Sequence, residues 1–140
     1  MIFPADFTDA HRRHWSDAEL LFKHARWANA DQLYGFSAEC GLKAVMKALG
    51  MRVETTGIPT KQKHRKHIQE IWPTFATFVQ GRGGARYLRM LSSGTPFADW
   101  SHHNRYADRA CFPKPDVQPH RKAAFEVCKV VRLAVQEGRL

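Results

Sequence analysis

The sequence predicts an all-α protein, an antiparallel up-and-down bundle of four to five helices in a single domain over residues 1–140. Three segments repeat apolar residues every three or four positions, which is the period of an amphipathic helix. No segment alternates apolar and polar residues as a half-buried strand does. A chain of 140 residues is also long enough to bury a core without disulfides.

The first helix is expected to begin at Thr8 or Asp9, because either side chain can accept backbone N–H bonds as an N-cap. We expect it to run to about Ala25. Its apolar residues form one stripe on the helical period. They are Trp15, Ala18, Phe22 and Ala25.

The second helix is expected over residues 28–49, with Gly50 as a left-handed C-cap. Apolar residues surround most of its circumference, which is typical of the central helix of a bundle. Gly35 and Gly41 lower its helix propensity by about 1 kcal/mol each. We therefore expect these two glycines to let a neighbouring helix pack closely.

The sequence pattern in the middle of the chain indicates helices less clearly than the patterns on either side. Residues 51–66 read as a connecting loop that ends in a basic run. A third helix is expected over residues 67–79, where Pro73 should either kink the helix or start a separate short one. A short helix is expected over residues 85–91.

Residues 92–115 read as irregular structure that is rich in aromatic residues, histidine and arginine. The final helix is expected to begin near Pro119, because proline suits the first turn of a helix, and to continue to Gln136. Its alanines and valines supply a second long apolar stripe, and the sequence shows no internal repeat.

The amino-acid composition further restricts the class of protein and its cellular compartment. Apolar residues make up 44% of the chain and charged residues 25%, as in ordinary globular proteins. No apolar stretch approaches the roughly 18 residues of a membrane span, and the N-terminus does not resemble a secretory signal. The three cysteines, Cys40, Cys111 and Cys128, contain no CxxC pair. Free thiols in a reducing compartment, and hence a cytoplasmic protein, are expected.

The net charge of +9 is unevenly spread. Residues 55–98 hold seven basic side chains against Glu70 alone. This asymmetry favours an anionic partner such as nucleic acid, although a solvated surface would show the same pattern. The candidate nucleic-acid-binding residues are Lys61, Lys63, Arg65, Lys66, Arg82, Arg86 and Arg89. Trp72 and Tyr87 are candidates for stacking on bases, with the core as the favoured place for Trp72.

A second candidate site consists of polar and aromatic residues that the fold should bring together. They are Asp17, Glu39, Lys43, Trp100, Arg105 and Tyr106. Two interpretations are open. The set is either a pocket for a nucleotide or phosphate, or a buried salt-bridge network in which Arg105 ties its loop to the first two helices. The structural interpretation is favoured, since such a network needs no ligand.

Two passages resemble the HEPN family (higher eukaryotes and prokaryotes nucleotide-binding). Residues 14–50 contain D-A-x-x-L and then L-Y-G-x-x-A-E-x-x-L-K, and Trp100 to Asp108 reads W-x-x-x-x-R-Y-A-D. The resemblance implies a helical bundle that often dimerises. Many members are metal-independent ribonucleases. Others bind nucleotides, or are the partner of a nucleotidyltransferase in toxin–antitoxin pairs.

The nuclease members carry an arginine and a histidine separated by four to six residues, and no arginine of this chain has a histidine five to seven positions downstream. The sequence therefore favours a binding module for RNA, a nucleotide or a protein partner. The resemblance alone implies a toxin–antitoxin or defence system as its setting. One alternative is a ribonuclease with an atypical site, in which His102 or His103 acts with Arg105. Another is a structural subunit. No cofactor is expected, and no motif with metal-ligand spacing is present.

Overall fold

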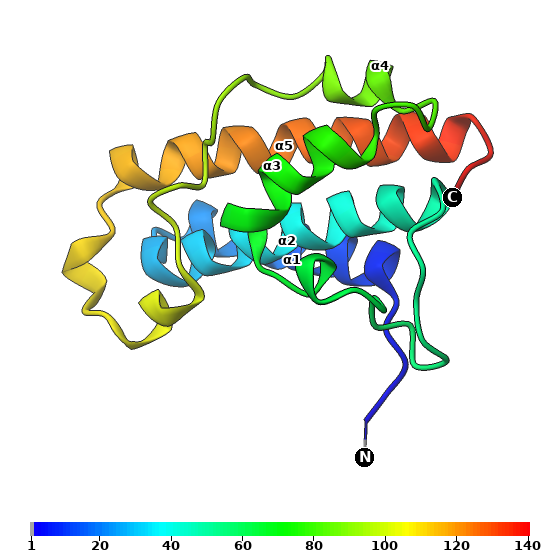
Figure 1. The fold of residues 1–140 in the computed structure, drawn as a ribbon. Coiled ribbons are helices and arrows are strands. Elements are labelled where there is room, and N and C mark those ends of the chain that lie inside the picture. The colour runs from blue at the N-terminus through cyan, green and yellow to red at the C-terminus, as the bar shows by residue number, and fades with distance from the viewer. Residues whose placement is uncertain (1) are drawn as a thin grey trace.

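The computed structural model describes residues 2–140 and is helical, as predicted (Figure 1). The described part contains five α-helices and no named strand. The α-helices are α1 (Phe7–Lys23), α2 (Trp27–Ala48), α3 (Ile68–Phe78), α4 (Ala85–Leu88) and α5 (Lys114–Gln136). Three short 3₁₀ helices accompany them: η1 (Gln62–His64), η2 (His102–Tyr106) and η3 (Arg109–Cys111). The predicted bundle of four to five helices is therefore confirmed.

Helix α1 is offset from its predicted bounds at both ends. Its N-cap is Asp6, whose carboxylate accepts a hydrogen bond from the Asp9 backbone N–H at 2.9 Å, so the helix begins earlier than Thr8. It ends at Lys23 because Ala25 adopts the left-handed conformation, with φ +58°. This tight turn reverses the chain into α2 and gives an antiparallel pair (Figure 1).

Helix α2 is the central helix of the bundle, as its apolar circumference predicts. It packs against α1, α3 and α5. A Cβ on Gly41 would lie 2.5 Å from Val127 of α5 and 2.7 Å from His11 of α1, so this glycine does permit close helix packing. At Gly35 the neighbour is different. A Cβ there would lie 2.1 Å from the indole of Trp100, which belongs to a loop.

The middle segment differs from the prediction in two details. Helix α3 continues through Pro73 as one helix, so no separate helix begins there. Helix α4 ends at Leu88, short of the predicted residue 91. The loop before α3 is closed by an isolated bridge between Val53 and Pro59.

Helix α5 begins at Lys114, which corrects the predicted start near Pro119. Pro115 occupies the first turn, where the missing N–H costs nothing, and Pro119 lies inside the helix. Val117 is fully buried, so the additional turn is anchored in the core. No helix within residues 2–140 has both the length and the apolar character that a membrane crossing requires.

Candidate functional site

The loop that precedes α5 is pinned to the first half of α2. Trp100 is buried against Gly35, and its indole N–H donates a hydrogen bond to the backbone oxygen of Asp31 at 2.9 Å. The side-chain amide of Gln32 donates to the backbone oxygen of Ser101 at 2.9 Å. Both contacts fix the residues just before η2. In Figure 1 this yellow segment lies beside the start of α2.

Three imidazoles gather where η2 meets the start of α3, and we call them, with Glu39 and Lys43 of α2, the histidine cluster. The His67 and His102 ring centroids are 4.1 Å apart, as are those of His102 and His103. His67 Nδ1 lies 2.9 Å from one carboxylate oxygen of Glu39, and Lys43 Nζ lies 2.9 Å from the other. A carboxylate only accepts hydrogen bonds, so the proton of His67 is on Nδ1. Its Nε2 is then available for proton exchange.

His102 is the least satisfied member of the histidine cluster. Its Nδ1 is closed to solvent and has no hydrogen-bond partner. Its pKa is lowered from the ordinary value of 6.5, first by burial and then by the charges of His67, His103 and Arg105, while Glu39 opposes the shift. His102 is therefore mainly neutral at pH 7 and is able to accept a proton.

Arg105 and Tyr106 lie beside this cluster on the surface. The guanidinium of Arg105 donates to the backbone oxygen of His102 at 2.8 Å and to the Tyr106 hydroxyl at 3.0 Å. It also lies over the Tyr106 ring, 4.4 Å from its centroid. Within residues 2–140 it makes no ion pair with a carboxylate. The predicted salt bridge from Arg105 to the first two helices is therefore not formed, and the guanidinium can meet an anion.

Asp17 is the one member of the predicted set that stands apart. It is exposed on α1 and makes no ion pair within the described part of the chain. Asp17 and Glu39 both act on His14, raising its pKa against the larger effects of burial and Arg13. The structure thus groups Glu39, Lys43, Trp100 and Arg105 around His102, and leaves Asp17 at the edge.

The sequence did not point to His67 as a site residue. The sequence pattern places His67 at the start of the third helix, in a basic run, and the structure shows that His67 is the N-cap of α3. Its contact with Glu39 joins residues 28 positions apart. No local sequence pattern predicts a contact over that separation. The eight histidines of the chain are the one sequence feature that indicates a histidine-containing site.

The predicted nucleic-acid-binding residues fall into two groups. Arg65 pairs with Glu54, and Arg86 pairs with Glu137. The remaining five make no ion pair within residues 2–140: Lys61, Lys63, Lys66, Arg82 and Arg89. Trp72 and Tyr87 are both buried, so neither offers a face to a base, and the core interpretation of Trp72 is confirmed.

A second buried imidazole is held between two carboxylates, and we call this set the His120 clasp. His120 Nδ1 lies 2.5 Å from Asp31 of α2, and Nε2 lies 2.7 Å from Asp99 of the loop. Burial lowers the pKa of His120, but the hydrogen bonds and charges of Asp31 and Asp99 outweigh it, so the pKa is raised. The clasp fixes the loop at Asp99, three residues before η2 begins at His102.

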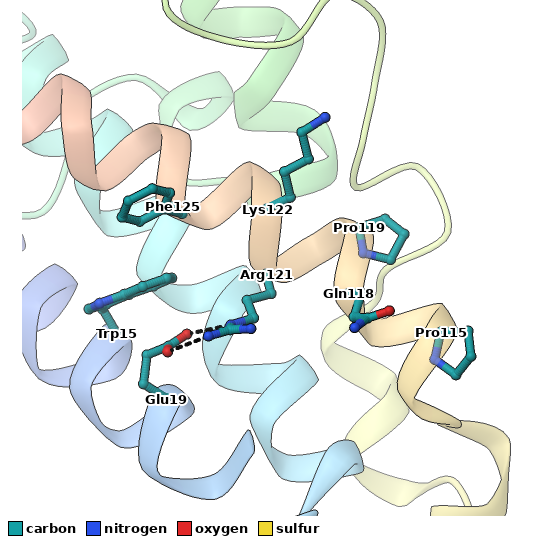
Figure 2. Close-up of a pocket in the computed structure, with 8 residues that line it drawn as sticks. All are labelled: Trp15, Glu19, Pro115, Gln118, Pro119, Arg121, Lys122 and Phe125. Atoms are coloured by element: carbon teal, nitrogen blue, oxygen red, sulfur yellow. Dashed lines mark hydrogen bonds and ion pairs between the residues drawn. The ribbon is translucent and has the colours of Figure 1, made fainter. Parts of the chain in front are cut away.

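A groove with a volume of about 760 Å³ lies elsewhere, between α1 and α5 (Figure 2). Trp15 and Phe125 stack there with centroids 5.8 Å apart. Glu19 accepts two hydrogen bonds from Arg121, at 2.8 and 2.9 Å. None of the predicted site residues lines this groove. Its charged pair is satisfied internally, so the groove by itself indicates no ligand.

The remaining chemistry is limited. Within residues 2–140, no group of three histidine, cysteine or acidic side chains is placed to hold a metal ion. Burial raises the pKa of the Cys40 and Cys128 thiols to about 12, which makes them unreactive. Comparisons of the chain with protein-family models, curated proteins and solved structures found no match.

Proposed function

We propose that this chain is a HEPN-like helical protein that binds RNA and cleaves it without a metal ion. The observation that carries the proposal is the grouping of His102, whose pKa is lowered, with the Glu39-held His67 and with Arg105, which makes no ion pair within residues 2–140. Acid–base cleavage of RNA needs a proton acceptor, a proton donor and a cation at the phosphate. These residues supply all three.

The proposed roles follow from the grouping of these side chains and from the lowered pKa of His102. His102 accepts the proton of the ribose 2′-hydroxyl, whose oxygen then bonds to the adjacent phosphorus. The bond from phosphorus to the 5′-oxygen breaks, and a protonated His67 or His103 gives that oxygen its proton. Arg105 neutralises charge on the phosphate oxygens. The products are a 2′,3′-cyclic phosphate and a 5′-hydroxyl end.

The resemblance supports this proposal and also limits it. HEPN nucleases combine one arginine with one downstream histidine, whereas here His102 and His103 precede Arg105. The partner imidazole of His67 comes from a different part of the chain. A homodimer, or a complex with a nucleotidyltransferase in a toxin–antitoxin pair, is part of the proposal on the resemblance alone. A cytoplasmic location is part of it because the three cysteines are free thiols.

A second candidate function is RNA binding without cleavage. It is favoured by the exposed Lys61, Lys63, Arg82 and Arg89, which make no ion pair within the described residues. Such side chains attract a phosphate backbone and make binding depend on salt. In this case the histidine cluster would only help to hold the RNA.

Incubation of the purified protein with mixed RNA and EDTA separates the two functions. We expect cleavage to 2′,3′-cyclic phosphate ends, and a loss of about 100-fold or more in His102→Ala and in Arg105→Ala. The matched controls are His24→Ala and Arg132→Ala, which change exposed residues at the end of α1 and in the second half of α5. Salt-dependent binding with no cleavage by the unchanged protein would establish the binding function and refute the nuclease.

A further inference from the structure

The structure contains a separate pocket beside His64. It is formed by η1, the outer face of α3 and the residues that follow α3, and it has a volume of about 530 Å³. Its polar residues are cationic or neutral, and no carboxylate lines it. The residues are Lys63, His64, Pro73, Thr74, Thr77, Phe78, Gln80 and Arg82.

His64 is the unusual member of this pocket. Its side chain is 97% buried, since only 3% of the residue is exposed, yet neither ring nitrogen has a hydrogen-bond partner. Buried polar atoms in proteins nearly always have partners, and each one without a partner costs about 1–3 kcal/mol. An imidazole with two unpartnered nitrogens therefore indicates a group that binds there.

The charges around His64 identify the chemistry of that group. Lys63 and Arg82 line the pocket and make no ion pair within residues 2–140. Arg82 lies over the Phe78 ring, 4.1 Å from its centroid, and His64 meets the same ring edge-on at 5.5 Å. Burial and then the charges of Lys63, Lys61, Arg82 and Lys43 lower the pKa of His64. An anion would reverse that effect.

We propose that the His64 pocket binds a phosphate group, with Lys63 and Arg82 pairing its oxygens and His64 donating a ring N–H. The ring nitrogens are closed to solvent, so the phosphate reaches one only after a small movement of the side chains that line the pocket. Thr74 and Thr77 add hydroxyl donors at the α3 side. The phosphate is either an RNA backbone diester, in which case the inference rests on the proposed function, or a terminal monoester.

The test follows the His64 ring by NMR while inorganic phosphate is added to the full chain. We expect the His64 signals to move saturably and the pKa of His64 to rise, because the bound anion stabilises the imidazolium. Arg82→Ala should weaken the affinity about tenfold, the factor expected for one charge-assisted hydrogen bond. Arg132→Ala, an exposed arginine on α5, is the matched control. An unmoved His64, or equal weakening in both variants, would overturn the proposal.

The source of the phosphate is decided by competition with two RNA oligonucleotides of the same sequence, one with a 5′-phosphate and one with a 5′-hydroxyl end. If both oligonucleotides displace inorganic phosphate equally, the pocket binds the backbone diester. If only the oligonucleotide with the 5′-phosphate displaces it, the pocket binds a terminal monoester. The result is independent of the cleavage assay. Phosphate binding without RNA cleavage would support the His64 pocket and contradict the proposed nuclease. RNA cleavage without phosphate binding would support the nuclease and contradict the pocket.

Discussion

The His120 clasp and the histidine cluster share one loop, which supplies Asp99 to the clasp and His102 and His103 to the cluster, and they use imidazole in opposite ways. In the clasp both ring nitrogens contact a carboxylate, and the pKa of His120 is raised. In the cluster the Nδ1 of His102 has no partner, and its pKa is lowered. The His120 imidazole has both nitrogens held by carboxylates, which favours its charged form. The His102 imidazole is mainly neutral and has one nitrogen without a partner.

This difference shows how a protein can separate structure from chemistry with one residue type. An imidazolium between two carboxylates cannot exchange its protons without loss of both contacts, so it suits a structural role. An imidazole surrounded by positive charge gives up its proton readily and suits the role of a base. The number of partners on the ring, more than the presence of a histidine, distinguishes the two sites.

The largest expected effect comes from removal of the buried partner in the clasp. Asp31→Ala leaves the buried His120 with only the exposed Asp99, and should lower the free energy of unfolding by about 3 kcal/mol. Urea denaturation measures this change. Asp99→Ala is the matched comparison. Its side chain is 79% exposed, so we expect a loss under about 1 kcal/mol. A loss under about 1 kcal/mol for Asp31→Ala as well would show that the buried pair of Asp31 and His120 does not stabilise the fold.

A smaller effect is expected where the loop meets α2. Gly35→Ala places a Cβ against the Trp100 indole and should cost about 2 kcal/mol of stability, because overpacking displaces the ring. Cleavage should fall as well, since Trp100 fixes the position of η2. The double variant Gly35→Ala with Trp100→Leu relieves the clash, and a double-mutant cycle by denaturation gives the coupling. Additive losses would place the two residues out of contact.

The pH dependence of stability should have opposite signs for different histidines. The raised pKa of His120 stabilises the fold below its ordinary value of 6.5, and this stability is lost as the pH rises through the folded-state pKa. The buried His11 has a lowered pKa, chiefly through burial, so its contribution is present above 6.5 and lost on acidification. Unfolding curves of His120→Gln should lack the alkaline loss, and an unchanged alkaline limb would contradict this assignment.

The smallest effect is expected at Tyr106, which is 77% exposed. Tyr106→Phe removes the hydroxyl that accepts from Arg105 but keeps the ring under the guanidinium. Cleavage should fall only a few-fold, in line with one hydrogen bond worth about 1 kcal/mol, while stability stays unchanged. Steady-state kinetics and denaturation measure the two quantities. A loss as large as that of Arg105→Ala would make Tyr106 a functional group in its own right.

The sequence predicted the helices well because their signals are local. The apolar periods of α1, α2 and α5 and the left-handed Gly50 were all readable, and only the ends moved. The predicted start of α5 near Pro119 was wrong because proline suits the first turn of a helix, and Pro115, four residues earlier, occupies that turn in the structure. Helix ends in general carry weaker signals than helix centres.

The candidate site was predicted only in part, since its contacts are not local. Glu39 and Lys43 are four residues apart on one helix, and their ion pair follows from that spacing. The contacts of Glu39 with His67 and of His120 with Asp31 join residues 28 and 89 positions apart. Such contacts depend on how the loops return to α2, which no single-sequence pattern specifies.

The loop anchored by Trp100 carries Asp99 of the clasp and His102 of the cluster only three positions apart. Deprotonation of His120 in alkaline solution removes a charge that holds Asp99, and so loosens the segment that positions His102. On the proposed function, an alkaline decline in turnover would then arise in part from misalignment of His102. The proton on His120 of α5 would thereby set the position of His102 beside the start of α3.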